Sequence, residues 1–144
     1  MTDKALMRTI VRIANTDVDG SKSIYHNLRN IPGVSYMFSN AILATAGIPH
    51  DKKAGELDEN EIKKIEAIIK DPIGHGFPVW LVNRRKDVED GKDRHLITVN
   101  LRFRRDYDIK MMQKMKNYKG IRHALGQPVR GQRTKAHFRT GSSI

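Results

Sequence analysis

The chain of 144 residues contains no cysteine. This absence excludes disulfide bonds, a thiolate nucleophile and any zinc or iron–sulfur site with cysteine ligands. No apolar run approaches the roughly 20 residues of a membrane-spanning helix, and the first residues lack the apolar core of a signal peptide. The length suits one domain, or one domain with a tail, since a domain takes about 150 residues. We therefore expect a soluble intracellular protein.

Acidic residues are missing from the end of the chain. Residues 101–144 carry twelve Lys and Arg against two acidic residues, and no acidic residue lies beyond Asp108. Residues 1–100 are nearly neutral, with fifteen basic and fourteen acidic side chains, so the net charge of +11 belongs almost entirely to the last third. A segment that cannot neutralise itself favours a polyanionic partner, of which nucleic acid is the natural example. A solubilising tail and a membrane-surface contact stay open as alternatives.

Three helices are expected in the first half of the chain. Apolar residues recur at helical spacing in three groups: Ile24, Leu28 and Ile31; Val34, Phe38, Ile42 and Ala46; and Ile62, Ile65 and Ile69. Ser35 is a suitable N-cap for the second helix, and Asp58 with Glu61 has the spacing of a capping box for the third. The first two helices meet at Pro32-Gly33. Such a helical hairpin either presents backbone N–H groups to phosphates or simply turns a corner.

Strands are expected at two places. Arg8–Ala14 predicts a strand or an extended arm, and Asn15–Ser21 predicts a turn. The β-rich runs Val79–Val82 and His95–Val99 predict a long-looped β-hairpin around residues 79–99, which must lean on the helices because an isolated hairpin is marginally stable. A further helix is expected over Leu101–Asn117, with methionines 111, 112 and 115 filling the core.

These patterns predict a mainly α fold, with a helical globular domain over residues 1–117 that carries the hairpin around 79–99. Residues 118–144 form an extended basic C-terminal segment and tail, with a short helix around Ile121–Leu125.

The basic segment from Tyr118 to Lys135 has the composition of an element that grips phosphates. Its arginines offer planar forks for phosphate oxygens, and its lysines act as point charges. Its glycines permit close approach of the backbone to a ligand, and the side chains of Gln132 and Thr134 can donate hydrogen bonds to phosphate, base or ribose. His123 has no carboxylate or cysteine nearby in the segment, so a packing or RNA-contacting role is favoured over catalysis. We assign no catalytic residue, no metal site and no cofactor.

The motifs Gly120–His123 and Gln127–Lys135 are similar to those of the universal small-subunit ribosomal protein family that is numbered thirteen in the bacterial naming, in its archaeal and eukaryotic branch. The resemblance covers almost the whole chain and includes Arg12–Ala14, Ile31–Val34 and Arg139–Gly141.

The resemblance implies a helical domain with a helix-two-turns-helix element and a long tail. It implies a non-enzymatic structural protein of the small-subunit head, cytoplasmic and ribosome-associated, with no membrane partner. The implied partners are small-subunit rRNA, the neighbouring head protein numbered nineteen, the large-subunit protein numbered five at an intersubunit bridge, and the peptidyl-site tRNA. The rRNA-binding residues carried over by motif are Lys119, Gly120, Arg122, His123, Arg130, Gly131, Gln132, Arg133, Thr134, Lys135 and Arg139.

Two departures from the family pattern limit what the resemblance implies. The segment from Val79 to Val99 is longer than its bacterial counterpart, so its contacts are not assigned. Residues Gly141–Ile144 lack the lysine cluster common in the family, so the resemblance supports rRNA binding more than tRNA contact.

Two other classes of protein share parts of this pattern. Base-excision DNA glycosylases share the helix-two-turns-helix element, but they use an N-terminal proline nucleophile and a cysteine zinc finger, whereas this chain starts Met1-Thr2-Asp3 and has no cysteine. A general nucleoid or chromatin protein would account for the charge but not for the Gly-Ile-Arg-His and Arg-Gly-Gln-Arg-Thr motifs.

Overall fold

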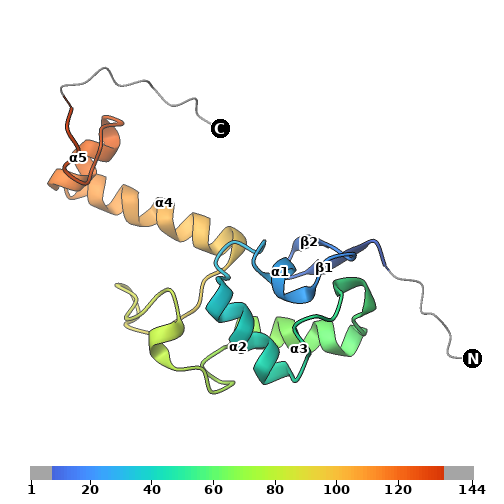
Figure 1. The fold of residues 1–144 in the computed structure, drawn as a ribbon. Coiled ribbons are helices and arrows are strands. Elements are labelled where there is room, and N and C mark those ends of the chain that lie inside the picture. The colour runs from blue at the N-terminus through green and yellow to red at the C-terminus, as the bar shows by residue number, and fades with distance from the viewer. Residues whose placement is uncertain (1–7, 135–144) are drawn as a thin grey trace, which may run out of the picture. The chain divides into compact units, whose positions relative to one another are not determined.

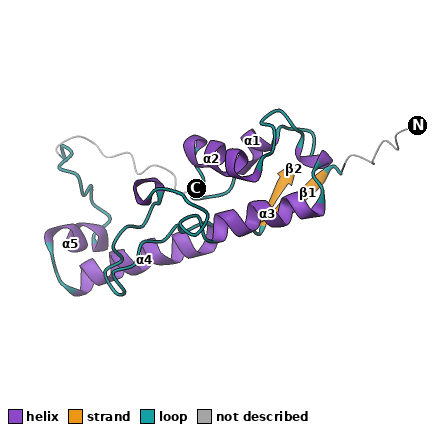
Figure 2. Cartoon of the chain, turned by 90° about the horizontal axis from the view of Figure 1, so that it is seen from below, coloured by secondary structure: helices purple, strands orange, loops and turns teal. Residues whose placement is uncertain are grey.

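A computed structural model describes residues 8–134 of the protein. Within that range the chain is mainly helical and has one two-stranded antiparallel sheet, so the predicted fold class is confirmed. Figure 2 shows the helices and the small sheet separately coloured. The strands are β1 (Ile10–Ile13) and β2 (Thr16–Asp19), and the helices are α1 (Ile24–Leu28), α2 (Tyr36–Ala46), α3 (Glu59–Lys70), α4 (Thr98–Lys114) and α5 (Tyr118–Ala124). Two short 3-10 turns cover Ala54–Glu56 and Val79–Leu81.

The β-hairpin lies at the start of the described chain. The strand expected in residues 8–14 is confirmed as β1, but the turn predicted over residues 15–21 is wrong because most of it is strand β2. The turn itself is Ala14-Asn15, where both residues take positive φ, as a two-residue hairpin turn of type I′ requires. Val11 and Val18 face each other across the strands and are both buried, so the hairpin contributes one face to the core.

The helix boundaries follow the expected capping residues. The Ser35 hydroxyl accepts a hydrogen bond from the Phe38 N–H at 3.4 Å, and Gly47 ends α2 in the left-handed conformation that an L side chain rarely adopts. The capping box at α3 is present, with the Glu61 carboxylate accepting from the Asp58 N–H at 2.9 Å. Local hydrogen bonds of this kind satisfy backbone groups that a helix end would otherwise leave unpaired.

The core joins the hairpin to the first three helices. α2 packs on α3 and on α1, and α1 contacts β2, as Figure 1 shows in blue to green. Every predicted apolar stripe reaches this core, although Ala46 and Ile62 are only partly buried. The buried residues of this connected core are Val11, Ile13, Val18, Ile24, Leu28, Ile31, Val34, Phe38, Ile42, Leu43, Ile48, Ala54, Leu57, Ile65, Ile68, Ile69 and Phe77.

The β-hairpin predicted around residues 79–99 does not form. Val79–Leu81 is a 3-10 turn, and the strand-type pairing between the two arms is a single isolated bridge between Arg84 and Arg94. The Asn83 side chain takes the place of a strand partner, since it donates to the Leu96 carbonyl at 2.7 Å and accepts from the Leu96 N–H at 2.8 Å. A two-stranded hairpin needs packing on one face to be stable. Trp80, on the first arm, is 67% exposed and supplies no such packing.

The chain divides into two compact units between Leu101 and Arg102. We call the part up to Leu101 the helical unit and the part from Arg102 onward the basic unit. The sequence had predicted a boundary at residue 117, which assigned all of the fourth helix to the first domain. The methionine prediction is wrong: α4 has no buried residue, and Met115 is 62% exposed.

Phe38 makes the central aromatic contacts of the helical unit. Its ring stacks on the His95 ring, with centroids 3.8 Å apart, and meets the Phe77 ring edge to face at 5.5 Å. Burial lowers the pKa of His95, and the backbone of Gly33 acts in the opposite direction. The folded protein therefore favours the neutral imidazole more strongly than the unfolded chain does.

This pKa shift predicts a pH dependence of stability. Because the pKa of His95 is lower in the folded protein, the unfolded state binds more protons below about pH 6.5, the ordinary histidine value. We expect the His95 contribution to the free energy of unfolding to be constant above that pH, to decrease as the pH falls from about 6.5 toward the folded pKa, and to level off below it. Denaturant titrations between pH 5 and 8 measure it. His95→Phe keeps a stacked ring and should remove this decrease; an unchanged decrease in the variant would contradict the assignment.

Candidate nucleic-acid interface

Helix α5 is the ordered start of the basic segment. Its N-cap is Asn117, whose side chain accepts a hydrogen bond from the Gly120 N–H at 2.6 Å. Gly120 is buried, and a Cβ atom there would fall far inside contact distance of the Met112 carbonyl oxygen on α4. Figures 1 and 2 both show α5 lying against the C-terminal end of α4. The missing side chain at residue 120 thus lets two helices approach each other, and we assign Gly120 to packing.

The Arg122 guanidinium donates hydrogen bonds to neighbouring groups of the protein itself. Its Nε donates to the Pro128 carbonyl at 3.0 Å, and its Nη1 donates to the Gln127 side chain. The guanidinium also lies over the Tyr118 ring, 5.7 Å from the centroid. Gly126, with φ +64°, reverses the chain after α5. The Arg122 contacts then hold the reversed segment against the helix. Arg122 therefore positions the following cations.

The remaining sequence-predicted residues within the described range are exposed. They belong to α5 and to the segment that follows it, and they are Lys119, His123, Arg130, Gly131, Gln132, Arg133 and Thr134. Gly131 has φ +75°, and the Gln132 side chain accepts from the Arg130 N–H at 3.0 Å, so the two arginines flank a tight turn. Lys135 and Arg139, also predicted, lie outside the described residues.

Further cations of the basic unit lie on α4 and beside it. Lys110, Lys114 and Lys116 are exposed and were absent from the predicted set. These lysines precede the Gly120–His123 motif, yet the sequence carried a signal for them, because the acid-free stretch begins directly after Asp108. A charged surface is thus spread over two helices and a turn, which is a wider area than the motifs indicated.

The described residues hold neither a metal-binding cluster nor a membrane-spanning helix. Over residues 8–134, no group of three or more His, Asp or Glu side chains is placed to hold a metal ion. In the same range no helix has the length and apolar content to cross a membrane. The exposed cationic surface is suited to a polyanion. The fold of the chain and the charge of its basic unit define the class of small helical proteins that carry a basic appendage.

Comparison with known proteins is consistent with that class. A family model described as ribosomal protein S13/S18 matches residues 12–140. The Small ribosomal subunit protein uS13 of Methanothermobacter thermautotrophicus is 45% identical over 135 residues, covering 94% of this chain and 91% of its own. Its counterpart in Nanoarchaeum equitans is 42% identical over 137 residues, covering 95% and 90%, and that of Staphylothermus marinus is 44% identical over 137 residues, covering 95% and 91%.

The chain belongs to the ribosomal protein S13/S18 family. It is a structural protein of the small ribosomal subunit and not an enzyme. The resemblance drawn from the Gly-Ile-Arg-His and Arg-Gly-Gln-Arg-Thr motifs is confirmed, and the DNA-glycosylase and nucleoid alternatives are excluded.

The packing of Gly120 gives a prediction with a diagnostic sign. Helix propensity alone would make Gly120→Ala stabilising by about 1 kcal/mol. We expect the opposite, because the added methyl group meets the Met112 backbone and must push α5 away. Hydrogen exchange at the Ile121 and Leu125 amides, which bond within α5, measures the effect and should become faster. Slower exchange at these amides would contradict the close packing.

Proposed function

We propose that the basic unit binds small-subunit rRNA and thereby fixes the protein in the head of the subunit. The observation that carries the proposal is the exposed cationic surface of α4, α5 and the Arg130–Arg133 turn, in a stretch without a single carboxylate after Asp108. Backbone phosphates supply most of the affinity in such complexes, because neutralising them releases condensed counterions.

The proposed roles of the side chains follow from their geometry. Arg130 and Arg133 present planar forks on either side of the Gly131 turn, which suits two neighbouring phosphates. Thr134 and His123 are exposed hydrogen-bonding groups that suit a phosphate, a base edge or a ribose hydroxyl. Arg122 and Gly120 act through the fold, since one holds the turn and the other holds α5 on α4.

The partners implied by the resemblance are part of the same proposal. In it the protein contacts the head protein numbered nineteen, joins a bridge to the large-subunit protein numbered five, and extends toward the peptidyl-site tRNA. Lys135 and Arg139 complete the rRNA-binding set. Support for these finer statements is the match to the family over residues 12–140.

Equilibrium binding to a transcript of the small-subunit rRNA head tests the proposal. With roughly six to eight phosphate contacts, log K should fall with log salt at a slope of about −4 to −7. The double variant Arg130→Gln/Arg133→Gln should bind more weakly and lower the magnitude of the slope by about one for each lost contact. The matched control Lys63→Gln/Lys64→Gln removes two exposed charges from α3 and should bind as the wild type does.

Two results would contradict the proposal. An affinity that is independent of salt would remove its electrostatic basis, and an equal loss in both double variants would show that only total charge matters.

A further inference from the structure

A second acid-free stretch lies within the helical unit. Residues 20–50 contain no Asp or Glu, although the first hundred residues as a whole are nearly neutral. The cations of this stretch are Lys22 and Arg29, and both are exposed. Lys22 is ion-paired at 3.4 Å with the Asp19 carboxylate just before this stretch, so the Arg29 guanidinium at the end of α1 is the cation that a phosphate backbone would meet here.

Five side chains from this stretch form a connected group of rings and a guanidinium, which we call the ring cluster: Tyr25, His26, Arg29, Tyr36 and His50. The Arg29 guanidinium carbon lies over the Tyr36 ring, 4.2 Å from the ring centroid. The Tyr25 ring lies 6.0 Å from Tyr36, 5.6 Å from His26 and 5.5 Å from His50. The cluster thus joins α1, the first turn of α2 and the loop after α2.

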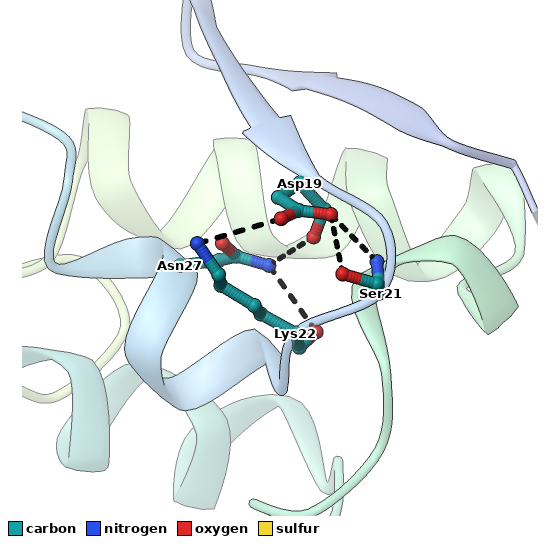
Figure 3. A network of polar contacts seen from close by, with 4 residues as sticks. All are labelled: Asp19, Ser21, Lys22 and Asn27. Carbon is teal, nitrogen blue, oxygen red and sulfur yellow. Dashed lines mark hydrogen bonds and ion pairs between the residues drawn. The ribbon is translucent and has the colours of Figure 1, made fainter.

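The ring cluster is held in place by core packing and by hydrogen bonds in and around α1. Tyr25 packs against the hydrophobic core, and the Ser23 hydroxyl is 2.9 Å from Nδ1 of His26. The turn that leads into α1 is closed by Asp19, whose carboxylate accepts from the Ser21 N–H at 2.9 Å and hydroxyl at 2.7 Å (Figure 3).

Figure 3 also shows how α1 is tied to that turn. The buried Asn27 side chain donates to the carbonyls of Asp19 at 2.6 Å and Lys22 at 3.2 Å. A surface fixed in this way loses little conformational entropy when a ligand binds, so its contacts convert more fully into affinity.

We propose that the ring cluster is a second rRNA contact, at which an unpaired base stacks on Tyr36 and Arg29. Tyr36 is 51% exposed, and the Arg29 guanidinium over its ring adds a second planar group on which a base can stack. Base stacking accepts any base because every base has a π face. None of the five side chains in the ring cluster is acidic, which favours a nucleic acid over a basic protein segment. This inference rests on the proposed function and adds a site on the other unit of the chain.

The test uses the full-length protein and the same rRNA-head transcript. Tyr36→Leu removes the ring and keeps an apolar side chain, so the affinity should fall by about tenfold, the effect of losing one stacked base. Tyr36→Phe keeps the ring and should bind as the wild type does. Arg29→Lys keeps the charge but loses the planar face, and it should also weaken binding.

The salt dependence separates this inference from the proposed function. Loss of stacking should leave the slope of log K against log salt unchanged, whereas loss of Arg130 and Arg133 should reduce it. Wild-type affinity of Tyr36→Leu for the transcript would overturn this inference and leave the proposed function standing. If Tyr36→Leu kept that affinity but lost binding to another head protein, the ring cluster would be a protein contact instead. A wild-type protein that does not bind the transcript would overturn both. Circular dichroism of each variant checks that the helices are retained.

Discussion

The helical unit depends on the aromatic contacts of Phe38. This ring stacks on His95 and meets Phe77 edge to face, so one side chain of α2 joins two segments that lie far along the sequence. Aromatic pairs of this kind add about 0.5–1.5 kcal/mol beyond the area that they bury. These two ring contacts add to the packing of Leu81 and Ile97 against the core and to the Asn83–Leu96 hydrogen bonds, and together they hold the irregular segment between α3 and α4.

The two units differ in where their apolar area and their net charge lie. The helical unit contains the hydrophobic core, and its charged side chains are balanced, as in the Lys52–Glu61 ion pair at 2.7 Å. In the basic unit no residue of α4 is buried, and the exposed apolar side chains include Phe103 and Leu125. Such a unit gains stability from a partner that supplies both counter-charge and contact area, and folded rRNA offers both.

Capping signals in the sequence were reliable predictors, whereas the turn expected over residues 15–21 and the strands expected around 79–99 were not. Ser35 and the Asp58 capping box predicted helix starts correctly because capping is decided within one turn. The strands expected around 79–99 failed because the Asn83 side chain pairs with the backbone of the opposite arm, which no propensity anticipates. The sequence also could not show that Gly120 serves helix packing, since a glycine that admits a ligand and one that admits a helix look alike.

The central claim is that this chain is an integral component of the small ribosomal subunit, held there by contacts that go beyond diffuse charge. Sedimentation of a cell lysate through sucrose gradients, first at moderate and then at high salt, with immunoblotting for this chain, tests the claim most directly. We predict co-migration with the small subunit that persists at high salt, because packed and stacked contacts resist the screening that weakens exposed charge. Release to the top of the gradient at high salt would contradict the account.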